Sequence, residues 1–203
     1  MSYSNFTNKN LKDLFGVEVI PQGGLYDKVP PRRIGNWLKV FLEQNTDFAI
    51  LQATEKARSE FIIAPIFAEL RQQAEEKISI FSGWELNVDA GKGLTGRCDF
   101  LVSRTPYQAV MESPIVVAVE AKQDDFNKGT TQCLAEMIGA RIFNEREGNP
   151  QTEIYGTVTT GDAWRFLSLR ENQGLFEPNL LTIKEIDKIF GILWAMTFGE
   201  VPI

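Results

Sequence analysis

Two carboxylates and one ammonium group stand near the ends of strand-like segments in the middle of the chain. Asp99 lies in one predicted strand, and the triplet Glu120-Ala121-Lys122 closes a second, strongly apolar one. Side chains two residues apart on a strand share a face, so Glu120 and Lys122 point the same way. If the two strands pair, Asp99 stands next to Glu120. The three polar groups then converge at a strand end.

An acid-x-base triplet at the margin of a sheet is commonly a solvated ion pair, which contributes little to stability. Three features favour a functional site. The triplet ends the most apolar strand of the chain, where an unpaired charge is costly. Asp99 and the downstream Gln132 add oxygen and amide groups, and Glu60 in a preceding helix offers a third carboxylate.

Clustered carboxylates are typical of a site for a hard cation. Mg²⁺ takes oxygen ligands in octahedral geometry and keeps several waters, and Mn²⁺ prefers similar ligands. Such an ion would polarise a phosphodiester and acidify a bound water. Lys122 would hold a positive charge where negative charge grows during the attack. This chemistry needs no histidine.

The composition excludes several other classes of site. The 203 residues include no histidine, which removes Ser-His-Asp triads, Cys-His nucleophile pairs and histidine zinc sites. The two cysteines, Cys98 and Cys133, form no CxxC motif, so we expect small buried apolar residues in a reduced, cytoplasmic setting. A net charge of −6 weakens any broad electrostatic attraction to nucleic acid.

One motif resembles a dinucleotide site but lacks its context. Residues 91–96, Gly-Lys-Gly-Leu-Thr-Gly, match G-x-G-x-x-G. The motif binds a pyrophosphate at the N-terminus of the helix that follows it, whereas here two strand-like segments flank it. A glycine-rich hairpin is the better interpretation. The sequence also shows neither a signal peptide nor an apolar run that could span a membrane.

Hydrophobic periodicity predicts the elements that must position these groups. We expect helices near 34–41, from 54 to about 73 with a kink or break at Pro65, from about 127 to 145, and from a Thr182–Glu185 capping box through Trp194. We expect strands at 78–88, 94–103, 115–119, 154–159 and 164–169, the last two joined by a hairpin turn.

This order predicts an α/β fold, with a mixed central sheet flanked by helices. The length fits a single domain. Within it, we expect residues 1–53 to form an N-terminal elaboration packed on the core, and residues 54–203 to form the core with its C-terminal helix.

Taken in order along the chain, these residues resemble the PD-(D/E)xK nuclease superfamily. The resemblance covers about residues 54–170 and rests on Glu60, Asp99, the Glu120–Lys122 triplet and Gln132. It looks most like the small uncharacterised cyanobacterial members, and it implies a restriction-endonuclease-like core of order α-β-β-β-α-β. Cys98 stands where the motif has a proline.

The resemblance also implies a role for each residue. Asp99 and Glu120 would hold the metal, with the Ala121 carbonyl and Glu60 as further ligands. Lys122 would orient the attacking water, and Gln132 would assist from its helix.

The leading hypothesis is therefore a Mg²⁺-dependent phosphodiesterase that acts on nucleic acid, DNA in the first instance. Its main alternative is a nuclease-fold protein that no longer cuts and serves as a binding or regulatory module, which the net acidity favours. A small-molecule hydrolase or a structural protein sharing the fold is a third hypothesis, because fold does not fix function. A homodimer is compatible with either of the first two.

Overall fold

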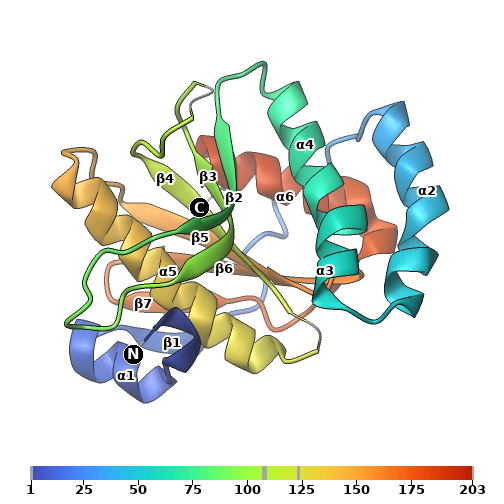
Figure 1. Cartoon of the computed structure of the whole chain (residues 1–203). Coiled ribbons are helices and arrows are strands. Elements are labelled where there is room, and N and C mark those ends of the chain that lie inside the picture. Colours follow the sequence, from blue (N-terminus) through green and yellow to red (C-terminus); the bar gives the residue numbers. More distant parts are fainter. Residues whose placement is uncertain (1, 107–108, 123, 203) are drawn as a thin grey trace.

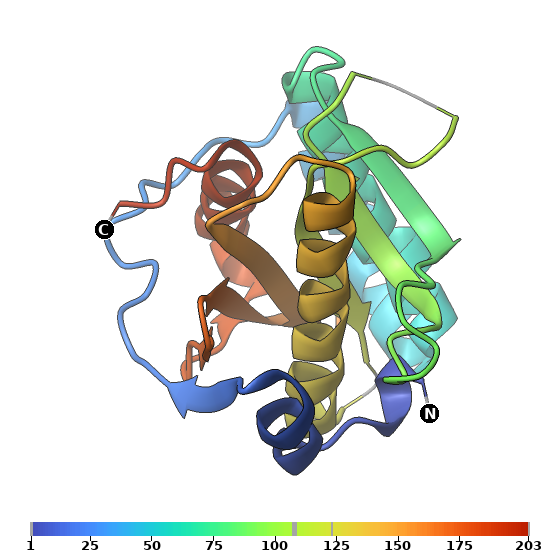
Figure 2. The same ribbon diagram turned by 90° about the vertical axis from the view of Figure 1, so that its left-hand side faces the viewer.

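A computed structural model describes residues 2–106, 109–122 and 124–202 of the chain. The described residues form a mixed β-sheet between two layers of helices. Helix α5 crosses one face of the sheet, with α1 beside it, and α4 and α6 lie on the other face with α2 outside them (Figures 1 and 2). The predicted α/β class and flanked mixed sheet are confirmed.

The sheet runs in the order β1-β7-β6-β5-β4-β3-β2, with β8 paired to β6. Pairs β4–β5 and β1–β7 are parallel, and the other pairs are antiparallel. The strands are β1 (Glu18–Pro21), β2 (Ser79–Glu85), β3 (Arg97–Ser103), β4 (Ile115–Ala121), β5 (Glu153–Thr159), β6 (Ala163–Arg170), β7 (Gln173–Phe176) and β8 (Leu181–Thr182).

Every residue of β4 is buried, as its run of β-branched residues predicts for a central strand. The helical segments are η1 (Tyr3–Asn5), α1 (Asn8–Phe15), α2 (Asn36–Leu51), α3 (Glu55–Arg58), η2 (Ser59–Ile63), α4 (Ala64–Gln73), α5 (Phe126–Arg146), η3 (Ile183–Glu185) and α6 (Ile186–Phe198).

The helix expected over 54–73 is divided into three parts, α3, η2 and α4. Its irregular part is the π-helical turn η2, which ends just before Pro65, and Pro65 itself lies in the first turn of α4. A proline lacks an N–H group and crowds the carbonyl four residues before it. The wider π turn is therefore placed where the regular hydrogen-bond pattern would fail.

Local signals account for several other boundaries. The Asp125 carboxylate accepts a hydrogen bond from the Lys128 N–H at 2.9 Å, and α5 begins directly after it. The predicted capping box is present, since the Thr182 N–H donates to Glu185 at 2.9 Å. In the glycine-rich motif, Gly93 and Gly96 have φ angles of 80° and 147°, so the chain turns there and β3 starts only at Arg97.

The N-terminal part of the chain contributes more structure than its sequence pattern predicts. Helix α1 and strand β1 were not expected, and α2 extends ten residues beyond the predicted end at 41. Strand β1 pairs in parallel with β7, which is also unexpected and lies some 150 residues later. Short edge strands carry too few residues for a clear periodic pattern, and their pairing is a long-range contact.

Two apolar cores lie on the two faces of the sheet. One is shared with α2, α4 and α6, and the other with α5 and α1. In α6, a Cβ at Gly191 would lie 2.2 Å from the Pro30 carbonyl oxygen, so glycine allows the segment before α2 to cross this helix in direct contact. In the described part of the chain, no helix is both long and apolar enough to cross a membrane.

Candidate functional site

Asp99 and Glu120 come from neighbouring strands and lie on the same face of the sheet. Strands β3 and β4 are antiparallel, with Phe100 opposite Val119. One step further along the ladder, Asp99 stands opposite Glu120. Side chains alternate along a strand, so both acids point to the face that α5 covers. The close approach on which the predicted site depends is present in the structure.

Lys122 and the backbone of Ala121 complete this group. The Lys122 ammonium lies 2.5 Å from Glu120 Oε1, and the Glu120 side chain is only 3% exposed. The Ala121 N–H donates to Asp99 Oδ2 at 2.7 Å, which fixes the orientation of that carboxylate. In a strand, the N–H and C=O of one residue point to the same side. The Ala121 carbonyl therefore also faces the side on which Asp99 lies.

Helix α5 brings Gln132 to the site through a residue that the sequence pattern did not identify. Gln132 Nε2 donates to Glu136 Oε1 at 3.1 Å, one helical turn later. Glu136 is fully buried, and its carboxyl is in hydrogen-bond contact with that of Glu120. Gln132 thus reaches Glu120 by way of Glu136. Gln132 and Glu136 are four residues apart and so share one helix face, and this spacing is the sequence signal that could have identified Glu136.

A glycine sets the distance between α5 and the strand ends. A Cβ at Gly129 would lie 2.6 Å from Val158 Cγ1 and 3.0 Å from Lys122 Cγ. The first turn of α5 therefore packs directly on the end of β4, where Lys122 follows the strand. A larger residue would push the helix, and with it Glu136, away from Glu120.

Burial is the largest cause of the pKa shifts of the three acids. It raises the pKa of Glu120 to about 7, with the charge of Asp99 adding to the effect and Lys122 opposing it. Burial also raises the pKa of Asp99, although the hydrogen bond from the Ala121 amide opposes this. It raises the pKa of Glu136 well above its usual range, and the charge of Glu120 adds to that effect. Burial lowers the pKa of Lys122, but the combined attraction of Glu120, Glu55 and Asp99 outweighs it and leaves this pKa raised.

In the helical segments before β2, the acid that acts on the site is Glu55 rather than Glu60. Glu60 pairs with Lys56 at 2.6 Å, and 54% of its side chain is exposed. Glu55, at the start of α3, acts electrostatically on both Asp99 and Lys122. The structure therefore brings together Asp99, Glu120, Lys122 and, through Glu136, Gln132, and it leaves Glu60 in a surface ion pair.

The carboxylates of Asp99 and Glu120 fit a divalent cation held by two acids. Within the described ranges, no group of three or more His, Cys, Asp or Glu side chains is arranged to hold a metal ion. Mg²⁺ needs only one or two carboxylates, because it keeps several waters. Asp99 and Glu120 meet that requirement with the Ala121 carbonyl beside them. In addition, Glu120 Oε2 is buried and, apart from the contact with the Glu136 carboxyl, has no donor among the described residues.

The two cysteines take no part in this arrangement. Both are buried free thiols, and burial raises the pKa of each. A protonated, buried thiol behaves as a small apolar side chain, which agrees with the interpretation of these residues from the sequence.

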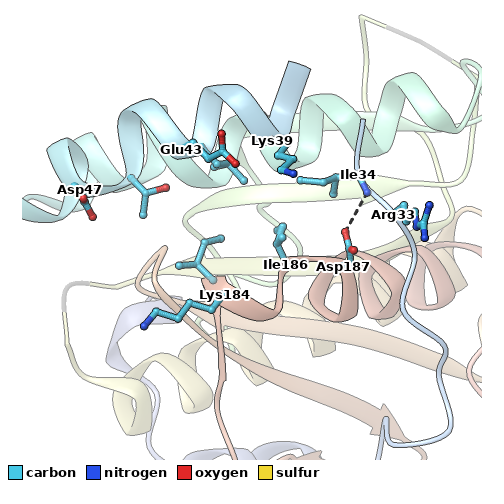
Figure 3. A pocket seen from close by; sticks show the side chains of 11 residues that line it. Arg33, Ile34, Lys39, Glu43, Asp47, Lys184, Ile186 and Asp187 are labelled. Atoms are coloured by element: carbon cyan, nitrogen blue, oxygen red, sulfur yellow. Dashed lines mark hydrogen bonds between the residues drawn. The ribbon is translucent and has the colours of Figure 1, made fainter. Parts of the chain in front are cut away.

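A large groove lies on the other face of the sheet, between α2 and the start of α6 (Figure 3). Its volume is about 690 Å³. Leu42 and Ile186 contribute apolar surface, and Lys39 and Asp187 contribute charges of opposite sign. Asp187 also accepts a hydrogen bond from the Ile34 N–H at 3.3 Å. None of the acids of the candidate site lines this groove.

Comparison with known proteins does not place the chain in a family. No protein-family model matches the sequence, and a search of the curated proteins finds no match.

Proposed function

We propose that this protein is a divalent-metal-dependent nuclease that hydrolyses phosphodiester bonds, with DNA as the first substrate to test. The observation that carries the proposal is the meeting of Asp99 and Glu120, which stand opposite each other on β3 and β4, with the Lys122 ammonium 2.5 Å from Glu120 Oε1. Two carboxylates on one face of the sheet with a lysine beside them are the groups that a Mg²⁺-dependent phosphodiesterase needs.

Each residue has a role that its position supports. Asp99 and Glu120 would hold Mg²⁺ or Mn²⁺, with the Ala121 carbonyl as a further ligand. When bound, such an ion supplies Lewis acidity to a phosphodiester. Lys122 orients the attacking water and places a positive charge beside the phosphate as negative charge develops. The Ala121 N–H holds Asp99 in place.

The order of elements around the site supports a more specific fold assignment. Helix α4, strands β2, β3 and β4, helix α5 and strand β5 follow the order α-β-β-β-α-β. We propose that this segment is a restriction-endonuclease-like core, as the resemblance to the PD-(D/E)xK superfamily implies. In that assignment, Asp99 on β3 and the Glu120–Lys122 triplet at the end of β4 would be the motif residues.

The net charge of −6 favours a second candidate, a protein of the same fold that binds a partner but does not cut nucleic acid. An acidic surface repels a polyanion, so any nucleic acid must be attracted locally at the site. The intact set of Asp99, Glu120 and Lys122 favours the nuclease, because a protein that does not cut has no need of a partly buried lysine beside two acids.

Cleavage assays separate the two candidates. Plasmid, single-stranded and branched DNA are incubated with the protein and Mg²⁺, Mn²⁺ or EDTA. We expect metal-dependent cutting that falls about 100-fold or more in Lys122→Ala. The control is Lys77→Ala, at a lysine whose side chain is 69% exposed, which should cut normally. If no substrate is cut and metal leaves the melting temperature unchanged, the proposal is wrong.

A further inference from the structure

Arg165 of β6 lies in the same row of the sheet as the acids of the candidate site. Glu120 of β4 stands opposite Val158 of β5, and Val158 stands opposite Arg165. Because Asp99 stands opposite Glu120, the four side chains form one row across four neighbouring strands. Neighbouring strands lie about 4.8 Å apart, so the Cα atoms of Glu120 and Arg165 are separated by roughly 10 Å. A polymer bound at the two acids would therefore pass close to Arg165.

Uncharged groups hold the Arg165 guanidinium in place. Its Cζ lies 5.3 Å from the centre of the Phe126 ring and 5.2 Å from that of the Phe176 ring, and a cation is attracted to the face of an aromatic ring. Its Nη1 donates to Asn127 Oδ1 at 3.3 Å and to Thr130 Oγ1 at 3.2 Å. These contacts orient the guanidinium on the α5 side of the sheet and leave its charge uncompensated.

Among the described residues, no Asp or Glu forms an ion pair with Arg165, whereas Arg58, Arg97 and Arg170 each have one. Burial lowers the pKa of Arg165, and no carboxylate opposes this shift. The side chain is partly exposed. Its Nε is buried without an acceptor, and its Nη2 is open to solvent and donates to no group in the described part of the chain. Arg165 can therefore accept an anion without first breaking an ion pair.

The first turn of α5 lies between Lys122 and Arg165. A Cβ at Gly129 would lie 3.0 Å from Lys122 Cγ, and Asn127 of the same turn contacts Arg165. A DNA strand with one phosphate beside Lys122 can cross this turn and present another phosphate to Arg165. The planar fork of an arginine matches the oxygen atoms of a phosphate, which makes arginine a common ligand of the DNA backbone.

We propose that Arg165 binds a phosphate of the DNA strand near the bond that is cut, and thereby positions the strand at Asp99 and Glu120. The inference rests on the proposed function, because it takes DNA as the substrate. Contacts to phosphates fix the position of a protein on DNA and carry no direct sequence information. Arg165 should therefore strengthen the binding of all DNA sequences alike.

Arg165→Met tests this, because it removes the charge and keeps an unbranched side chain between the two rings. Binding of fluorescently labelled single-stranded and duplex DNA is measured by anisotropy over a range of salt concentrations. EDTA keeps the DNA intact and makes the measurement independent of the proposed metal. We expect the affinity to fall about tenfold, as for other hydrogen bonds to a charged group. For duplex DNA, the slope of log affinity against log salt should become shallower by about 0.9, the value of one phosphate contact.

Arg146→Met is the matched control. Arg146 is exposed and ends α5, about 30 Å along the helix axis from Asn127, and its guanidinium donates to the Val88 carbonyl. This variant removes the same charge from the same helical layer, and its salt slope should equal that of the wild type. Melting temperatures show that each variant is folded. A purely structural role of Arg165 would lower the melting temperature and leave the salt slope unchanged.

The outcomes distinguish this inference from the proposed function. If Arg165→Met binds DNA with the affinity and salt slope of the wild type, the inference is overturned and the nuclease proposal stands. If the expected losses occur but the wild type cuts no DNA with metal, the phosphate site stands and the nuclease proposal is wrong. A wild type that binds no DNA overturns the inference. Should Arg165→Met fail to fold, Arg165→Gln must show the same losses, and an unchanged salt slope overturns the inference.

Discussion

Glu120 is the one ionisable residue of β4, and the physical properties of the site follow from its burial. The strand is otherwise apolar, and Lys122 lies just beyond its end. Because the strand is covered on both faces, the carboxyl loses most of its hydration. The ion pair with Lys122 compensates for part of that loss, and so does the contact with Glu136, whereas the charge of Asp99 further disfavours ionisation of Glu120.

A pH dependence of stability follows at this scale. Burial raises the pKa of Glu120 to about 7 in the folded protein, from an ordinary value of 4.5. The folded state therefore binds a proton more tightly than the unfolded state does. The stability from this group is complete below pH 4.5 and is lost as the pH rises through 7, on the order of 3 kcal/mol in all. We expect the melting temperature in EDTA to fall between pH 5 and pH 8.

Glu120→Gln provides the comparison for that measurement. The variant cannot titrate at this position, so the difference in melting temperature between it and the wild type should grow from pH 5 to pH 8. Circular dichroism melts in matched buffers measure the difference. Parallel melting curves across the range would show that Glu120 is ionised at all these pH values, contrary to the prediction.

At the scale of elements, the segment between β1 and α2 depends on α6 for its position. It has no regular secondary structure before Asn36, so its carbonyls need donors from elsewhere. Lys188 of α6 supplies them: its ammonium lies 2.9 Å from the Tyr26 oxygen, 3.1 Å from that of Asp27 and 2.5 Å from that of Val29. One side chain thereby fixes the approach to α2.

Lys188→Met should destabilise the protein by roughly 2–3 kcal/mol, because it removes three charged hydrogen bonds to carbonyls of this segment, of which the Tyr26 carbonyl keeps only the one from the Val29 N–H. Urea denaturation monitored by tryptophan fluorescence measures the change. The control is Lys184→Met in the preceding turn, at an exposed lysine, with an expected effect below about 0.5 kcal/mol. Equal effects of the two substitutions would contradict the stabilising role assigned to the Lys188 hydrogen bonds.

At the scale of the whole molecule, residues 1–53 take part in both layers of the fold. Leu11 is buried in the core under α5, and Leu38 and Leu42 are buried in the core on the opposite face. Strand β1 covers the edge of the sheet at β7. The N-terminal region therefore covers apolar surface on both sides of the sheet.

The fragment 54–203 tests whether the core can fold without residues 1–53. We expect it to be insoluble or to melt without cooperativity, because its removal exposes apolar surface on both faces and a free edge at β7. Expression of the fragment, followed by a thermal melt of any soluble material, measures this. A soluble fragment with a cooperative melt near that of the full chain would show that residues 54–203 fold alone.

The sequence by itself determined what depends on neighbours along the chain. The β-branched run 115–119 predicted a buried central strand, and the spacing of two between Glu120 and Lys122 placed them on one face. The capping box at Thr182 located the start of the last helical segment. These signals are short-range, because periodicity and capping act within a turn or two of a helix or along a single strand.

Only the tertiary structure decided which distant side chains meet at the site. A regular helix with 3.6 residues per turn predicts that Glu60 faces the site. The π turn in η2 changes the direction in which the following side chains point, and Glu55 is the acid that acts on Asp99. Glu136 meets Glu120 because the first turn of α5 packs directly on the end of β4. The packing distance and rotation of one element against another are set by contacts across the whole core, which no local pattern records.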